Sequence, residues 1–196
     1  MTSWFTDITL RGKTVTLVPL EEKHTDELAQ ASSDGDLSQL WFTSIPSKDT
    51  VQEYAQYALQ EKTAGTAHPF VVVHNETGAI IGSTRYCHAD STNRRLEIGY
   101  TWYARSFWQT TVNSECKLLL LQYAFETLSC IAVEFRTHWH NHRSRNAIAK
   151  LGAKQDGVLR NERIDAFGNY RDTVVFSILE NEWSVVKKSL EFRLSQ

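Results

Sequence analysis

Three histidines recur at alternate positions late in the chain, at His138, His140 and His142. On a continuous strand such residues share one face, and their imidazole nitrogens could bind a metal ion. This run instead crosses from the end of a predicted strand into the start of a predicted helix, with no carboxylate beside it. We therefore predict no metal site here, and we expect one of these histidines or Trp139 to line a ligand pocket.

The cysteines offer a second kind of chemistry. Cys87, Cys116 and Cys130 are an odd number and show no CxxC spacing, which favours reduced thiols over a disulfide or zinc framework. Cys116 could act as a nucleophile only with a histidine partner and a lowered pKa. Its place in a helical apolar period predicts a buried core thiol instead.

Length and composition limit the classes of function. The 196 residues are 41% hydrophobic and 22% charged, with a formal charge of -2. These values are typical of one soluble domain, expected to span residues 1–196. The charge balance gives no drive toward nucleic acid or anionic membranes. No apolar run approaches a membrane span, and the N-terminal residues lack the apolar region of a signal peptide, so we expect a cytoplasmic protein.

Hydrophobic periodicity predicts the elements that must position these residues. Alternation indicates strands and a period of 3.6 indicates helices. The predicted strands are Lys13–Pro19, His68–His74, Ala79–Cys87, Arg95–Tyr103, Ile131–His138, Lys154–Ile164 and Tyr170–Leu179. The predicted helices cover residues 20–33, 50–62, 112–128 and 143–151, with a closing segment at 183–190. This order requires a mixed sheet flanked by helices.

A series of short motifs follows the same order. The first is Leu96-Glu97-Ile98-Gly99-Tyr100 on the fourth strand, and the second is Trp108 before the long helix. The next helix carries Asn141-x-x-Ser144 and then Lys150-Leu151-Gly152. Together they resemble the RimJ/RimL-like branch of the GNAT superfamily of N-acetyltransferases. The resemblance implies the GNAT fold, an α/β (α+β) arrangement with a mixed, mostly antiparallel seven-stranded sheet whose fourth and fifth strands splay apart.

The resemblance also implies acetyl-CoA as co-substrate and no metal. The pantetheine arm would lie in the splay, because unpaired strand groups can bond its amides. The pyrophosphate would lie at the start of the long helix, where free N–H groups and the helix dipole favour anions. The residues expected to contact the coenzyme are Ile98, Tyr100, Trp102, Trp108, Gln109, Thr110, Thr111, Val112, Asn113, Asn141 and Ser144.

One departure concerns the turn before the long helix. The family usually has glycines there, whereas this chain reads Trp108-Gln109-Thr110-Thr111. Glycine lets backbone approach phosphate closely. Threonine hydroxyls and Arg105 could replace that contact. Glycine at positions 109 and 111 is expected to tighten coenzyme binding and to lower stability.

The implied reaction is acetyl transfer to a primary amine, either a protein N-terminal α-amine or a small-molecule amine. Glu97 is the candidate base, since the family often carries a glutamate on this strand. Its alternative role is a structural carboxylate paired with Arg94, Arg95 or Arg136. Strict alternation would place Glu97 on one face with Gly99, Thr101 and Tyr103.

The general acid is less well defined by the resemblance. Many members use a tyrosine at the position of Ile148, so Ser144, Tyr103 or water would protonate the thiolate here. The acceptor pocket could be closed by Trp4, Phe5, Trp41 and Phe42, or these could be core residues. The alternative function is a non-catalytic GNAT-fold binding or regulatory module. We expect no nucleic-acid or membrane partner, and a monomer or homodimer.

Overall fold

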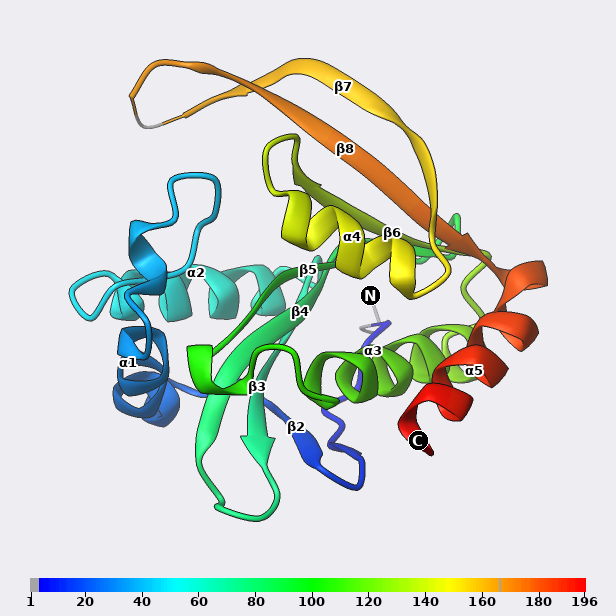
Figure 1. Cartoon of the computed structure of the whole chain (residues 1–196), viewed down its shortest axis with the longest axis horizontal. Coiled ribbons are helices and arrows are strands. Elements are labelled where there is room, and N and C mark those ends of the chain that lie inside the picture. The colour runs from blue at the N-terminus through cyan, green and yellow to red at the C-terminus, as the bar shows by residue number, and fades with distance from the viewer. Residues whose placement is uncertain (1–3, 166) are drawn as a thin grey trace.

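The computed structural model describes residues 4–165 and 167–196 and contains one open sheet of eight strands (Figure 1). Its order is β1-β2-β3-β4-β5-β6-β8-β7. Neighbours are antiparallel except for β5 and β6, which are parallel. The strands are β1 (Leu10–Arg11), β2 (Val15–Pro19), β3 (His68–His74), β4 (Ile80–Asp90), β5 (Arg95–Tyr103), β6 (Ala132–His138), β7 (Lys154–Ile164) and β8 (Tyr170–Leu179).

The predicted architecture is confirmed, with one strand more than the seven expected. The added strand, β1, is two residues long and pairs with Leu17 and Thr16 of β2. Two residues cannot show a hydrophobic alternation, so periodicity could not have found it. Because β1 comes first, the splayed fourth and fifth strands of the prediction are β5 and β6.

In the described part of the chain, five α-helices cover the two faces of the sheet, α1 and α2 on one face and α3, α4 and α5 on the other (Figure 1). The helices are α1 (Thr25–Ser33), α2 (Val51–Thr63), α3 (Val112–Gln122), α4 (His142–Lys150) and α5 (Glu180–Leu194). The predicted helix over 112–128 changes to a π-helical turn at Tyr123–Thr127. No helix in the described ranges is long and apolar enough to cross a membrane.

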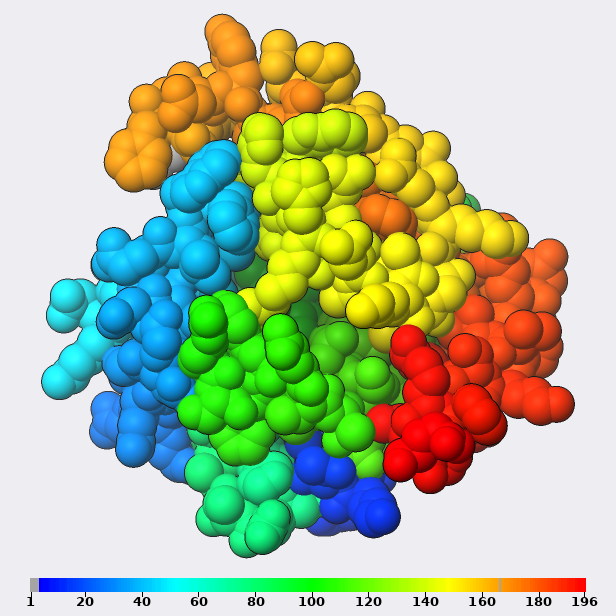
Figure 2. Space-filling view, viewed as in Figure 1, coloured from blue at the N-terminus to red at the C-terminus, as the bar shows by residue number. Residues whose placement is uncertain are grey.

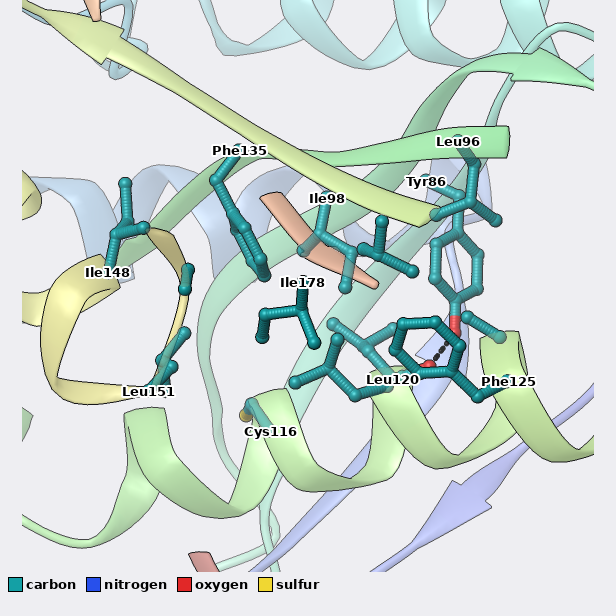
Figure 3. Packing of buried hydrophobic residues seen from close by; sticks show 14 of the residues in the cluster. Tyr86, Leu96, Ile98, Cys116, Leu120, Phe125, Phe135, Ile148, Leu151 and Ile178 are labelled. Atoms are coloured by element: carbon teal, nitrogen blue, oxygen red, sulfur yellow. Dashed lines mark hydrogen bonds between the residues drawn. The ribbon is translucent and has the colours of Figure 1, made fainter. Parts of the chain in front are cut away.

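Each face of the sheet has its own hydrophobic core. The larger core lies under α3, α4 and α5, where the Tyr86 hydroxyl donates to the Leu120 carbonyl at 2.6 Å (Figure 3). The smaller core lies under α1 and α2 and includes Leu28, Val71 and Trp102. β5 contributes side chains to both cores. The core in which each of its side chains packs therefore shows which face of the sheet that residue points to.

Glu115 ties the N-terminal strands to α3. Its buried carboxylate accepts the backbone N–H groups of Lys13, Thr14 and Val15 at 2.7, 2.8 and 3.0 Å. Gly12 gives this carboxylate its space, since a Cβ there would lie 2.7 Å from Glu115 Cδ. The β1–β2 turn therefore depends on one side chain from a helix about a hundred residues later.

We expect Glu115→Ala to lower the free energy of unfolding by about 3 kcal/mol, because it leaves three backbone donors without their charged acceptor. Urea denaturation measures this loss. Glu191→Ala is the matched control, since Glu191 is an exposed helical glutamate on α5. Its effect should stay within about 0.5 kcal/mol. A loss below about 1 kcal/mol for Glu115→Ala would contradict the anchoring role.

Candidate active site

The parallel pairing of β5 and β6 ends early. Within the described chain its register consists of three pairs, Arg95–Ala132, Leu96–Val133 and Glu97–Glu134. β5 then runs on to Tyr103 and β6 to His138 without pairing to each other, and β6 bonds β8 on its other side. The gap between these two strand ends, called the wedge below, presents backbone N–H and C=O groups that need partners. The predicted splay is confirmed.

The open end of the wedge is reached from the surface. Figure 2 shows a furrow between the yellow atoms of α4 and the green atoms of the segment leading into α3, with darker green atoms at its floor. The segment leading into α3 follows β5, and α4 follows β6. The furrow therefore separates the two chain segments that continue from the wedge.

A bulge in β5 changes the faces of its last residues. β4 and β5 lose register at Thr84, which stands opposite both Tyr100 and Thr101. Tyr100 has a φ of 50°, and such a residue reverses the alternation of the strand. The predicted face for Thr101 and Tyr103 is therefore wrong. Tyr103 packs in the larger core, and Trp102 packs in the smaller core instead.

Contacts of the bulged residues confirm this reversal. The ring of Tyr100 lies 4.0 Å from the guanidinium carbon of Arg85, whose Nη1 bonds Glu61 of α2 at 2.9 Å. Thr101 turns to the other face and accepts a hydrogen bond from Lys117 Nζ of α3 at 2.6 Å. Burial lowers the pKa of Lys117 to about 8. Glu97 and Tyr100 thus share the α1–α2 face of the sheet.

Glu97 lies where the wedge begins, since it is the last β5 residue paired with β6. Its side chain is almost buried, and its Oε2 lies 2.9 Å from His88 Nδ1 and 3.6 Å from Arg136 Nε. The hydrogen bond to Glu97 raises the pKa of His88, against an opposing effect of burial. Among the arginines predicted to pair with Glu97, Arg136 does so, whereas Arg95 bonds Glu134. Sequence reasoning missed His88.

The turn before α3 has a backbone shape that normally needs glycine. Gln109 has a φ of 63°, in the left-handed region that glycine adopts at no steric cost. The Trp108 Nε1 donates to the Tyr103 carbonyl at 2.8 Å, and the Thr110 hydroxyl accepts from Val112 N–H at 3.3 Å. α3 starts directly after this turn, and the N–H groups of a first helical turn have no carbonyl partner within the helix.

Two arginines flank Trp108 in this turn. The guanidinium carbon of Arg105 lies 4.3 Å from the indole centroid, and that of Arg143 lies 3.1 Å from it. Burial, then repulsion from Arg105, lowers the pKa of Arg143. Because Arg143 belongs to α4, this stack joins the segments that follow β5 and β6. Two positive charges therefore lie in the turn that leads into α3, and the sequence pointed only to Arg105.

The Asn141-x-x-Ser144 motif has a local structural role. Asn141 is the N-cap of α4, and its Oδ1 accepts the backbone N–H of Ser144 at 3.0 Å. Asparagine at an N-cap with its bond to the third helical residue is a standard helix start. The sequence therefore carries a signal for a helix cap in the same motif from which the family resemblance implies a coenzyme contact.

The larger core contains three residues considered for chemistry. Ile148, at the family's tyrosine position, is buried with Leu151 and Phe135 on the side of the sheet facing Cys116 (Figure 3). Burial raises the pKa of Cys116 to about 12, which confirms the prediction of a core thiol. Burial also raises the pKa of Tyr103 well above its usual value, so this tyrosine is a poor proton donor.

A cavity of about 240 Å³ opens beside the end of β6. It is lined by His138, Trp139, His140, Arg160, Asn161, Tyr170 and Asp172. His138 is buried and its Nδ1 accepts the His140 N–H at 3.0 Å, whereas His142 opens α4. His138, Trp139 and His140 therefore line a cavity, and its use as the acceptor pocket stays a prediction.

The four aromatic residues expected to close such a pocket divide into two groups. Trp41, from the segment between α1 and α2, packs edge-on against His138 with ring centroids 5.0 Å apart, and Phe42 packs on Trp41. Phe5 instead stacks on Tyr86 in the larger core, with Trp4 against it. Only the first pair lies near the cavity.

Comparison with known proteins agrees with this geometry. The family model described as "Acetyltransferase (GNAT) domain" matches residues 14–154, well over half of the chain. The chain belongs to the GNAT acetyltransferase family. As a GNAT acetyltransferase it is an enzyme of acetyl transfer, and the family match covers β2 to β6, including the wedge.

Relatives of this GNAT domain include curated and solved proteins. The chain is 28% identical over 181 residues to "Uncharacterized N-acetyltransferase p20" of Bacillus licheniformis, covering 90% of this chain and 98% of that protein. A GCN5-related N-acetyltransferase from Brucella melitensis superposes with a TM-score of 0.86 at 27% identity, over 95% and 85% of the two chains. RimJ of Mycobacterium smegmatis, solved with CoA-disulfide, shares the fold with a TM-score of 0.77 at 18% identity, over 91% and 88%.

Because Gln109 has a left-handed backbone and Thr111 does not, glycine should affect stability differently at these two positions. We expect Gln109→Gly to leave stability unchanged or to raise it by up to about 1 kcal/mol, because relief of left-handed strain offsets the added unfolded-state entropy. Thr111 has a φ of -72°, so Thr111→Gly gains no such relief and should cost about 0.5–1 kcal/mol. Urea denaturation of the two single variants measures both. Equal destabilisation would contradict the left-handed turn.

The cap at Asn141 adds a stability effect to its expected coenzyme contact. We expect Asn141→Ala to lower the free energy of unfolding by about 1 kcal/mol and to weaken acetyl-CoA binding. Asn146→Ala, an exposed position in the middle of α4, is the matched control for both measurements. Thermal unfolding and calorimetric titration report the two effects separately. A stability loss with unchanged affinity would make Asn141 a cap alone.

Proposed function

We propose that this GNAT protein transfers an acetyl group from acetyl-CoA to a primary amine, which attacks directly within a ternary complex. The observation that carries the proposal is the wedge, whose unpaired β5 edge starts just after Glu97 and leads toward Trp108. An arm that carries amides can bond such an edge as an added strand. Its phosphates would then lie near the first turn of α3.

The turn at residues 108–113 fits a pyrophosphate despite its lack of glycine. Gln109 already holds the left-handed backbone that would bring N–H groups toward a phosphate. The N-terminus of α3 favours an anion, and Arg105 and Arg143 supply two cations beside it. We propose that these arginines, together with backbone and side-chain donors of the turn, replace the close glycine contact. Ser144 and Asn141 lie at the start of α4, across the furrow.

The proposed chemistry uses Glu97 at the start of the wedge. Backbone N–H groups of β5 beyond Glu97 would polarise the thioester carbonyl, since they are fixed before reaction. The amine nitrogen forms a bond to the carbonyl carbon, and the carbon–sulfur bond breaks. Glu97 would accept the amine proton directly or through water. The leaving thiolate would take a proton from Ser144 or water, because Tyr103 is buried in the core.

The acceptor would approach through the cavity at the end of β6. Its volume of about 240 Å³ suits a group no larger than one or two amino-acid residues. Its walls are aromatic and polar, with Trp139 and Tyr170 beside His138. We favour a polypeptide N-terminus over a free amine, because the cavity could hold the first residue while the rest of the chain leaves along the surface.

The test is acetyl-CoA turnover with a panel of peptides and small amines, measured by release of free thiol. We expect turnover with peptides that carry a free α-amine and none with the same peptides α-acetylated. Glu97→Gln should lower kcat by about 10²–10⁴-fold, the usual contribution of a general base. It should leave acetyl-CoA binding intact, since Glu97 is placed for the amine.

The proposed contact between Arg143 and acetyl-CoA is tested with two variants on α4. Arg143→Ala should weaken acetyl-CoA binding by about 10–100-fold, because a hydrogen bond to a charged group contributes about 1.5–3 kcal/mol. Arg145→Ala is the control, since Arg145 lies on the same helix but stacks on Trp139 at 4.3 Å. Calorimetry that detects no acetyl-CoA binding by the folded wild-type protein would contradict the proposal and favour a non-catalytic module.

A further inference from the structure

A compact group of three metal-ligand side chains surrounds Glu97 on the α1–α2 face of the sheet. One ligand atom from each of Cys87, His88 and Glu97 lies within 4.8 Å of the other two. Cys87 is fully buried, Glu97 is nearly so, and the side chain of His88 is 58% exposed. None of the sequence motifs pointed to this group, because its members come from two strands.

Neighbouring strand residues normally point to opposite faces, yet Cys87 and His88 converge. His88 has a φ of 49°, and β4 loses register with β5 between Cys87 and Asp90. A non-glycine residue in this left-handed region is strained. The left-handed backbone at His88 turns its imidazole back toward Glu97, and His88 Nδ1 lies 2.9 Å from Glu97 Oε2. The Cys87 thiol donates to the Glu97 carbonyl at 3.7 Å, so both residues of β4 meet one residue of β5.

Gly99 leaves space beside the Glu97 carboxylate and the Cys87 thiol. A Cβ at Gly99 would lie 2.9 Å from Glu97 Oε1 and 3.1 Å from Cys87 Sγ. Any larger residue at this position would therefore crowd the carboxylate and the thiol. The exposed ring of His88 leaves one side of the group open to solvent, through which an ion could enter.

We propose that Cys87, His88 and Glu97 form a binding site for a thiophilic divalent cation of the zinc class. A thiolate, an imidazole and a carboxylate are the ligand types that zinc accepts, and three protein ligands plus water complete a tetrahedral site. Ligand atoms in such a site lie about 3.5 Å apart. The widest separation in the group, up to 4.8 Å, must therefore shorten by about 1 Å, whereas His88 Nδ1 and Glu97 Oε2 are already 2.9 Å apart. Calcium and magnesium prefer oxygen ligands and fit this set poorly.

Charge near the site does not prevent binding. Arg136 contacts Glu97 directly, at 3.6 Å, and this contact is longer than its contacts with Glu134 at 3.2 Å and Glu162 at 3.3 Å. Arg136 can therefore release Glu97 and keep two carboxylates.

Arg85 and Lys117 are further positive charges, and both favour the thiolate of Cys87 that a metal ion needs. On binding, the Cys87 S–H bond breaks, its proton passes to solvent, and a sulfur–metal bond forms without any change of oxidation state.

Occupancy of the site would remove the carboxylate that the proposed reaction uses as base. The ion would act as an inhibitor, because a metal-bound Glu97 cannot accept the amine proton. This regulatory consequence rests on the proposed function, whereas binding of the ion does not. The two statements can therefore be tested apart.

Binding is tested with Co²⁺ alone, added to the chelator-treated full chain. We expect visible d–d bands and a near-ultraviolet thiolate-to-cobalt band that saturate at one equivalent, and Zn²⁺ should displace them. Cys87→Ser should abolish the thiolate band. Cys116→Ser and Cys130→Ser, which alter buried thiols elsewhere, are the matched controls and should keep it. Absence of the band in folded wild type, or its survival in Cys87→Ser, overturns the site.

A second variant, His88→Ala, tests the site if Cys87→Ser fails to fold. His88→Ala changes a mostly exposed ring and should weaken Co²⁺ binding about tenfold or more. An unchanged titration for this variant would also overturn the site. In the activity assay, Zn²⁺ should inhibit wild type more strongly than His88→Ala. If Co²⁺ binds to wild type as expected but Zn²⁺ does not inhibit turnover, the metal site is supported and the role of Glu97 in acetyl transfer is contradicted.

Discussion

The short pairing between β5 and β6 is the constraint on which the rest of the structure depends. Three residue pairs hold the two strands together, and the last of them contains Glu97. Beyond this point β6 stays with β8, while β5 stays with β4 and bulges at Tyr100. The turn into α3 and the start of α4 then continue from the two separated strands. Arg143 stacked on Trp108 is a contact that joins these two segments again.

Much of this architecture could be predicted from periodicity. Long strands such as β5, β7 and β8 were predicted with the ends that the structure gives them, since each is a long run of strand-type residues with a turn on at least one side. The splay came from the family resemblance, which no local pattern could replace. The two-residue strand β1 was missed because it forms only against β2 and carries no pattern of its own.

The errors near the site have one physical origin. Tyr100, His88 and Gln109 all take positive φ values, which sequence reasoning assigns to glycine. Tertiary contacts hold two of these backbones in place, the stack of Tyr100 on Arg85 and the hydrogen bond of His88 to Glu97. Their partners lie on neighbouring strands, so a scan of local residue types cannot detect the strain. The reversed face of Thr101 and the unexpected neighbour of Glu97 both follow from it.

The wedge also sets a distance along the sheet. The stretch of β5 beyond Glu97 runs to Tyr103, six residues further on and about 20 Å away at strand spacing. β4 stays paired with this stretch as far as Gly82 opposite Tyr103, so the edge that faces the wedge is supported along its length from the other side. The Glu97 carboxylate at one end and the turn before α3 at the other are therefore kept apart by the length of one strand.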